Sequence, residues 1–166
     1  IESISKKQTS SKTVMPFITS SLQQTAFTKL GFSPKKTMLI AQKLYDGVQT
    51  ANNTQGIITY IRTDSTFVSR QAIQKAREYI QKTYGIKYLS DEKPTLQKKN
   101  AHEAIRVVNI NLTPSKLKKY LKVDEYQLYN LIYTRFVASQ MSNAIFNTSS
   151  IIISSKNIKF KVNGRM

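Results

Sequence analysis

Residues that start and stop helices divide the middle of this chain into short segments, and no other feature limits its fold as strongly. Proline directly follows Ser33 and Thr113, which is typical of a first helical turn, because serine or threonine caps the helix and proline there loses no needed amide hydrogen. Gly31, Gly47 and Gly85 each follow apolar residues at helical spacing, where glycine ends a helix. The sequence therefore predicts a succession of short helices.

The predicted helices cover, in chain order, residues 19–30, 34–46, 70–84, 101–106, 114–122 and 124–141. Thr19 or Ser20 is the expected cap of the first helix and Ser69 that of the third, and residues 47–55 and 86–99 are expected to be loops. The second helix is expected to bury Tyr45 together with the apolar residues one turn before it.

Both ends of the chain have the pattern of strands. Residues 151–153 are apolar, and apolar residues then alternate with lysine over 158–162, while residues 1–15 are predicted to be a strand end that continues into a loop. We expect the strands of the two ends to pair in a sheet next to a helical domain. The predicted domains are residues 1–15, 16–141 and 142–166, and the predicted fold class is mainly α within α+β.

The charge of the chain favours a polyanionic partner. The sequence has 26 Lys and Arg against 9 Asp and Glu, a formal net charge of +17, and the excess is dispersed along the chain as a phosphate backbone would require. A biased genomic composition is the alternative interpretation of this lysine excess.

Several classes of protein are disfavoured by composition. The chain has no cysteine and a single histidine, His102, so thiolate metal sites are excluded and a self-contained metal site is not expected. The sequence shows no apolar run of the roughly 20 residues that span a bilayer and no signal-peptide pattern. We expect a cytoplasmic protein without a membrane partner. Because the sequence begins at Ile1 without methionine and both ends stop within a strand-like pattern of residues, we also expect it to be part of a larger protein.

The segment GIITYIRTDS, residues 56–65, carries the strongest chemical signal. A tyrosine hydroxyl has a reference pKa of about 10, so it needs help to act as a nucleophile at neutral pH. Arg62 can bind two phosphate oxygens and stabilise the negative charge of a pentavalent transition state if Tyr60 attacks a phosphodiester. In a strand, residues 60 and 62 would project to the same face.

A structural interpretation of the same residues stays open at this point. Tyrosine in a β-prone run is more often a packed aromatic before a turn, and Asp64 and Ser65 are then ordinary turn or capping residues. A single histidine such as His102 is likewise more often structural than catalytic.

Five segments, in order, resemble bacterial type IA DNA topoisomerase I. They are PFITSSLQQ (16–24), LGFSPKKTMLIAQKLYDG (30–47), GIITYIRTDS (56–65), AHEAIR (101–106) and RFVASQM (135–141). The resemblance covers most of residues 16–166 and includes NGR near the C-terminus. Ordered blocks at plausible spacing are far more specific than any one short motif.

The resemblance implies roles for particular residues. Tyr60 matches the nucleophile that forms a 5′-phosphotyrosine bond, Arg62 the arginine that positions the scissile phosphate, and His102 a histidine that supports phosphate and strand binding. Five further residues match active-site or DNA-binding positions of the family and would act around these three. They are Gln42, Asp46, Thr59, Thr63 and Asp64.

Three positions depart from the family pattern. Asp46 stands where glutamate is usual, which shortens the side chain by one methylene, and Val107 replaces a proline, which predicts a looser turn. Ile61 lies between Tyr60 and Arg62 where the topoisomerase I branch has methionine and the topoisomerase III branch has proline, so it favours the first branch.

The resemblance also implies a fold, a cofactor and partners. The helical part is expected to have a helix-turn-helix-like arrangement and the strands to belong to an adjacent β-rich arch domain. Family members hold Mg²⁺ on acidic residues of an upstream domain, so no metal ligand is expected in this chain, and the isolated chain is expected to be inactive. The complete enzyme would be an isomerase that cuts one strand, passes a strand and religates. It would relax negatively supercoiled DNA without ATP, with single-stranded DNA and its own remaining domains as partners.

A second interpretation comes from a different class. The charge and the short helices between Thr113 and Met141 also fit a non-catalytic helical DNA-binding module. Lys116, Lys118, Lys119 and Lys122 would face phosphates in either case, unless they form only a solvated helix face.

Overall fold

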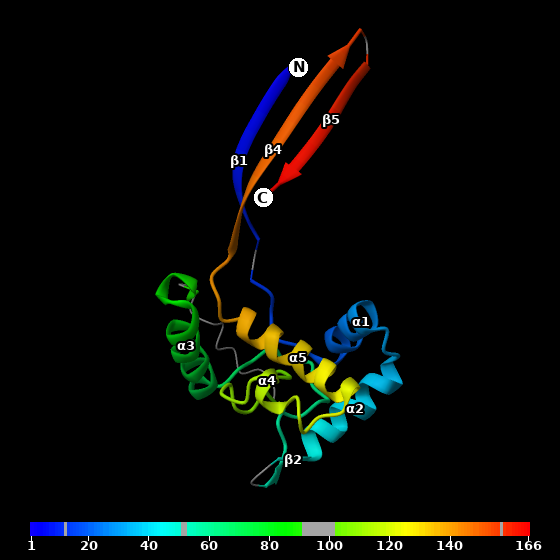
Figure 1. Cartoon of the computed structure of the whole chain (residues 1–166), viewed down its shortest axis with the longest axis vertical. Helices are drawn as coiled ribbons and strands as arrows, with labels where there is room; N and C mark the ends of the chain where they lie inside the picture. The colour runs from blue at the N-terminus through cyan, green and yellow to red at the C-terminus, as the bar shows by residue number, and fades with distance from the viewer. Residues whose placement is uncertain (12, 51–52, 91–101, 157) are drawn as a thin grey trace. The chain divides into compact units, whose positions relative to one another are not determined.

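The chain folds into two compact units, shown in the computed structural model of Figure 1, and its secondary structure as a whole is mixed α+β. The structure describes residues 1–11, 13–50, 53–90, 102–156 and 158–166. One unit combines Ile1–Thr13 with Asn143–Met166, and the other is Val14–Ser142. The elements are β1 (Ser3–Ser11), α1 (Thr19–Leu30), α2 (Pro34–Asp46), β2 (Val48–Gln49), β3 (Thr54–Gln55), α3 (Arg70–Tyr84), η1 (Ile86–Tyr88), α4 (Pro114–Leu117), α5 (Val123–Ala138), β4 (Ala144–Ser155) and β5 (Ile158–Arg165).

The first unit is an antiparallel sheet with the strand order β1-β4-β5. Ile151 of β4 lies opposite Ile4 on one side and Val162 on the other, so the apolar residues of three strands share one face. This pairing confirms the prediction that strands from the two ends of the chain form a sheet together. The assignment of these strands to an arch domain stays a prediction.

Local capping explains where α1 and α2 begin and end. Gly31 ends α1 in the left-handed conformation, with φ of 69°, as its position predicts. Ser33 accepts a hydrogen bond from the amide of Lys36, and proline occupies the first turn of α2. The cap of α1 is Ile18 rather than Thr19 or Ser20, because the Ser21 hydroxyl accepts a hydrogen bond from the Ile18 amide.

The core of the second unit lies along α5, which Figure 1 shows passing between the other helices. Leu128, Tyr129, Ile132 and Phe136 of α5 are almost completely buried. The predicted third helix is confirmed as α3 with Ser69 at its cap position, although Ser69 makes no side-chain hydrogen bond within the helix. Met141 lies beyond the end of α5, in an isolated bridge with Leu89.

Three predicted elements were wrong because long-range pairing or short local turns replaced them. Residues 102–106 are extended rather than helical: Ile105 donates to the Phe17 carbonyl (2.8 Å), and Val107 forms a bridge with Ile58. The predicted lysine-rich helix over 114–122 is only the short α4, and part of the predicted loop 47–55 is the β2–β3 pair. Ala101 and most of the predicted 86–99 loop lie outside the described residues.

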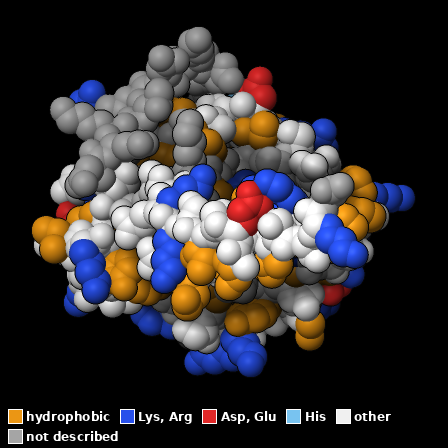
Figure 2. Space-filling model, turned by 90° about the horizontal axis from the view of Figure 1, so that it is seen from above, with side chains coloured by type: hydrophobic (Ala, Val, Ile, Leu, Met, Phe, Trp, Pro, Cys, Tyr) orange, Lys and Arg blue, Asp and Glu red, His pale blue; other side chains and the backbone are white. Residues whose placement is uncertain are grey.

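The surface charge follows the composition. The space-filling view in Figure 2 shows blue Lys and Arg side chains around the face it presents and few red Asp and Glu side chains. Within the described part of the chain, no helix is long and apolar enough to cross a membrane.

Candidate active site around Tyr60

The segment that carries Tyr60 begins at Gly56, in close contact with the end of α2. A Cβ atom added to Gly56 would lie 2.3 Å from the carbonyl oxygen of Tyr45, which is closer than real Cβ atoms approach. The next residue, Ile57, donates its amide hydrogen to the Leu44 carbonyl (2.9 Å) and is buried. Glycine is therefore required here by backbone packing, and this contact fixes where the segment starts.

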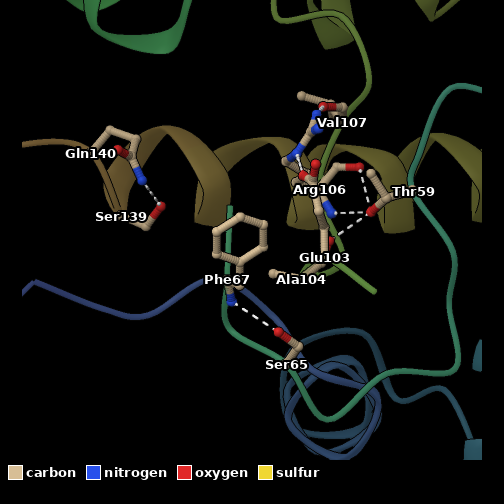
Figure 3. A network of polar contacts seen from close by, with 9 residues as sticks. All are labelled: Thr59, Ser65, Phe67, Glu103, Ala104, Arg106, Val107, Ser139 and Gln140. Atoms are coloured by element: carbon tan, nitrogen blue, oxygen red, sulfur yellow. Dashed lines mark hydrogen bonds and ion pairs between the residues drawn. The ribbon is translucent and has the colours of Figure 1, made fainter. Parts of the chain in front are cut away.

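Thr59 ties the residue before Tyr60 to the segment that carries His102. Its amide donates to the Arg106 carbonyl (2.9 Å), and its hydroxyl accepts from the Arg106 amide (2.9 Å) while donating to the Ala104 carbonyl (2.7 Å) (Figure 3). Three hydrogen bonds on one residue hold the two segments in a fixed register.

The residues after Tyr60 are held at the start of α1. Thr19 donates its hydroxyl to the Ile61 carbonyl (2.7 Å) and accepts from the Thr63 amide (2.9 Å), while its own amide donates to the Thr63 carbonyl (2.9 Å). Ile61 and Thr63 are buried, and Arg62 and Asp64 between and beyond them are exposed. The segment is not a ladder strand, because the backbone bends at Ile61 and Arg62, and its anchored residues leave Arg62 facing solvent.

The ring of Tyr60 lies against two other aromatic rings. Its centroid is 4.7 Å from that of His102, at 43° between planes, and 5.7 Å from that of Tyr45, in an edge-to-face arrangement. Tyr60 is half-buried, so contacts on its ring leave part of the side chain accessible. The structure thus brings Tyr60 and His102 together from two segments far apart in sequence.

A partly buried ion pair supports the His102 segment. The Arg106 guanidinium, on a residue only 9 % exposed, is 2.6 Å from a carboxylate oxygen of Glu103, and it donates to the Val107 carbonyl (2.9 Å) (Figure 3). Burial of Glu103 opposes its ionisation, but the hydrogen bond and charge of Arg106, with hydrogen bonds from Ser69, outweigh burial and hold its pKa below the ordinary 4.5. Because Ser69 precedes α3, Glu103 also connects this segment to the start of that helix.

Gln42 and Asp46 lie on α2, on either side of Tyr45. The amide of Gln42 donates to the Asp46 carboxylate (2.6 Å), so these two predicted residues contact each other across one helical turn. Asp46 and Asp64 are both exposed. Tyr45, which directly precedes Asp46, is the residue of α2 whose ring contacts Tyr60, and its exposure of 37 % contradicts the prediction that Tyr45 belongs to the core.

The described residues do not offer a metal centre. No group of three or more His, Cys, Asp or Glu side chains in this part of the chain is arranged to hold an ion. Magnesium prefers several oxygen ligands, so these residues do not fit it. Arg62 has no ion-pair partner among the described residues, and its charge remains available to an anion.

Several residues that shape this site were not singled out from the sequence. Gly56 could have been found as a glycine directly before a buried β-prone run, where a close backbone approach is common. No local pattern marks the other three residues, which are Tyr45, Thr19 and Glu103. They act through contacts between segments 15 to 44 positions apart or with the residue that precedes a helix.

The fold and the sequence of this chain are those of a segment of a DNA topoisomerase. Its structure superimposes on full-length topoisomerase I from Thermotoga maritima with a TM-score of 0.87 at 40% identity, over 99% of this chain and 27% of that one. A family model described as DNA topoisomerase matches residues 1–166.

The chain therefore belongs to the bacterial type IA DNA topoisomerase I family, whose members are isomerases. It is 49% identical to DNA topoisomerase 1 of Helicobacter pylori over 170 residues and 48% identical to that of Rickettsia typhi over 171 residues. Each alignment covers 99% of this chain, but only 23% and 22% of the two relatives. The chain thus spans about a quarter of the length of the proteins it matches.

Proposed function

We propose that Tyr60 is the nucleophile with which the complete enzyme cuts one strand of DNA. The observation that carries this proposal is the contact of the half-buried Tyr60 ring with His102. The segment of Tyr60 is held on both sides of the ring by hydrogen bonds of Thr59 and Thr63. A nucleophile must be held within a fraction of an ångström of its productive position, and this anchoring supplies that constraint.

In the proposed reaction the phenolic oxygen of Tyr60 attacks the phosphorus of a phosphodiester. A bond from that oxygen to phosphorus forms, the bond from phosphorus to the 3′ oxygen breaks, and the DNA 5′ end remains attached as a phosphotyrosine. The phenol loses a proton and the released 3′ oxygen gains one. Religation is the reverse exchange, so one ester replaces another and no ATP is consumed.

Arg62 and His102 act on the phosphate in this proposal. The exposed guanidinium of Arg62 binds the non-bridging oxygens and stabilises the charge of the transition state. His102 supports the phosphate and the strand beside the ring of Tyr60. Around them, Thr59 and Thr63 fix the backbone, and Gln42, Asp46 and Asp64 line its surroundings or contact the strand.

Further features of the complete enzyme follow from the same proposal. Helices α1 and α2, joined by residues 31–33, form a helix-turn-helix-like pair, and the strands belong to an arch domain. Mg²⁺ is held by residues outside the described part of this chain. The complete enzyme passes a strand and relaxes negatively supercoiled DNA in the bacterial cytoplasm, in association with the nucleoid. The similarity to relatives named DNA topoisomerase 1 supports this part of the proposal.

The test is the substitution Tyr60→Phe in the complete enzyme. It removes the attacking oxygen and keeps the ring that packs against His102, so the covalent adduct with a single-stranded oligonucleotide should disappear from denaturing gels while binding persists. Tyr45→Phe is the matched control, because it removes the hydroxyl of the neighbouring ring and should leave the adduct. Adduct formation by the Tyr60→Phe enzyme would refute the assignment.

The alternative function is a non-catalytic DNA-binding module, favoured by the lysine-rich surface at α4. In that case the parent enzyme would form no adduct, and neither tyrosine substitution would change any measured property beyond binding. The two functions are therefore separated by the same gel.

A further inference from the structure

A hollow of about 710 Å³ lies between the β2–β3 hairpin and α4, and no role is assigned to it by the site around Tyr60. In Figure 1 the hairpin lies below α4 in the helical unit. Asn53 lines it from the hairpin, and Lys116, Lys118 and Lys119 line it from α4 and the turn that follows. Leu112 and Leu117 are also among the lining residues, so the cationic wall adjoins apolar surface.

The charge of this hollow is not neutralised by the protein. The lysines at positions 116, 118 and 119 are exposed, and none of the ion pairs formed by described residues involves them. Lys36 differs, because it lies 2.7 Å from the carboxylate of Asp124. No Asp or Glu is among the lining residues, so three ammonium groups share one concave surface without a counter-charge.

The contacts of two of these lysines do not supply that counter-charge. The ammonium of Lys116 donates to the backbone carbonyl of Asn111 (3.1 Å), and that of Lys119 lies 4.8 Å from the centre of the Tyr120 ring. Both contacts hold the side chains beside the hollow and leave their full positive charge. Like charges that line one surface repel one another, and a bound anion would offset that repulsion.

We propose that this hollow is a second binding site for a DNA single strand, separate from the site of cleavage. Lys116, Lys118 and Lys119 contact successive phosphates, and the apolar and aromatic surface of Leu117 and Tyr120 receives bases. The aromatic partners of the Tyr60 ring among the described residues are Tyr45 and His102, and neither lines the hollow. The proposal rests on the proposed function in one respect, that DNA is the substrate.

The shape and chemistry of the hollow favour a single strand over a duplex. A volume of about 710 Å³ is typical of pockets for small ligands, ~300–1,000 Å³, and admits part of an extended strand rather than a double helix. Single-strand sites combine a cationic track with aromatic or apolar surface on which unpaired bases stack, and bases in a duplex are not free to do so. Polar side chains of Asn53 and Gln55 on the opposite wall can accept or donate hydrogen bonds to sugars or bases.

The test measures binding of fluorescently labelled oligothymidylate to the complete enzyme over a range of salt concentration. A triple variant, Lys116→Gln, Lys118→Gln and Lys119→Gln, is compared with Lys29→Gln, Lys75→Gln and Lys82→Gln, three exposed lysines of α1 and α3 that remove the same charge elsewhere. Each lost phosphate contact with a single strand should reduce the slope of log K against log salt by about 0.7, so the first variant should lose about 2 and the control none.

A second measurement needs no variant. Lysine acetylation of the complete enzyme, with and without saturating oligothymidylate, should show protection of the three lysines of the hollow and none of Lys75 or Lys82. Equal changes of slope in both triple variants, no change in either, absent protection, or stronger competition by duplex than by single-stranded DNA would each overturn the proposal.

The same experiment separates this proposal from the assignment of Tyr60. Loss of the adduct in Tyr60→Phe together with unchanged salt slopes in the lysine variant would refute the second site alone. Retention of the adduct in Tyr60→Phe would refute the cleavage proposal alone.

Discussion

At the scale of single residues, Gly56 shows that the position of Tyr60 depends on backbone packing. A methyl group at this position would overlap the carbonyl oxygen of Tyr45, which belongs to α2 and cannot rotate away. We predict that Gly56→Ala lowers the stability of the complete enzyme by about 1–3 kcal/mol, the usual cost of overpacking. Gly164→Ala is the control, because no atom lies within 4 Å of the added Cβ. Calorimetry should show a lower melting temperature for the first variant alone, and equal melting temperatures would contradict the packing argument.

Thr59 is the residue that sets the register between the segments of Tyr60 and His102. Thr59→Val keeps the shape of the side chain but removes the acceptor for the Arg106 amide and the donor to the Ala104 carbonyl. We predict a loss of about 1–3 kcal/mol in stability, because backbone groups lose their partners, and a slower rate of adduct formation, because Tyr60 is less well held. The rate is measured with rapid quenching and denaturing gels.

Thr66→Val is the matched control for that experiment, since Thr66 is exposed and directly follows the segment of residues 56–65. It should keep both the melting temperature and the rate of the parent enzyme. If Thr59→Val behaves like Thr66→Val, Thr59 has no positioning role.

The sequence predicted some residues of the site and could not predict others, for a physical reason. Tyr60 and Arg62 are two positions apart, so the local sequence alone predicts that they lie near each other. The pairing of His102 with Tyr60 was predicted from the family resemblance alone. The packing of Tyr45 on Tyr60 depends on where the end of α2 meets Gly56. Such contacts arise from the tertiary fold, and the helical spacing of Tyr45 instead suggested the core.

At the scale of elements, Glu103 links the His102 segment to the start of α3. Burial alone would raise its pKa, but Arg106 and Ser69 stabilise the carboxylate and lower the pKa below 4.5. A pKa that is lower in the folded than in the unfolded state adds stability that is complete above the unfolded value, and this stability is lost as the pH falls through the folded value. The contribution of Glu103 is therefore complete at neutral pH, begins to be lost as the pH falls below 4.5, and is gone once the pH is below the lower pKa of the folded state.

We predict that Glu103→Gln lowers the melting temperature at pH 7 and reduces its further fall below pH 4.5. The amide cannot ionise and weakens the contact with the Arg106 guanidinium. Melting temperatures of parent and variant are compared from pH 3.5 to pH 7 by calorimetry. A constant difference between the two across that range would show that the ionisation of Glu103 does not contribute.

Elements with local start and stop signals were predicted well, and elements made by distant pairing were not. The ends of α1 and α2 follow from Gly31, Ser33 and Pro34, which act within one helical turn. Residues 102–106 have helical composition, but their amides and carbonyls pair with residues near positions 17 and 59. Hydrogen bonds to distant segments overrode the local propensity there.

At the scale of the whole molecule, the helical unit contains a core of its own, and its described residues offer no metal site. Buried apolar residues from α1, α2, α3 and α5 form one cluster within residues 14–142. Close to Tyr60, the described residues supply an arginine, a histidine and threonines, but no group of ligands for a metal ion. The chain spans about a quarter of the length of its relatives, and the proposed reaction would take its metal ligands from residues outside the described part.

We predict that this chain by itself binds single-stranded DNA but does not cut it. With a net charge of +17, its affinity should fall steeply as salt increases, because counterions released from phosphates oppose binding at high salt. Incubation with a single-stranded oligonucleotide and Mg²⁺ should give no covalent adduct on a denaturing gel, whereas the complete enzyme should give one under the same conditions. Circular dichroism and a cooperative melting transition serve as the control that the chain is folded. A robust adduct would mean that Tyr60 and its neighbours in this chain suffice for cleavage, and an affinity independent of salt would mean that phosphate contacts do not drive binding.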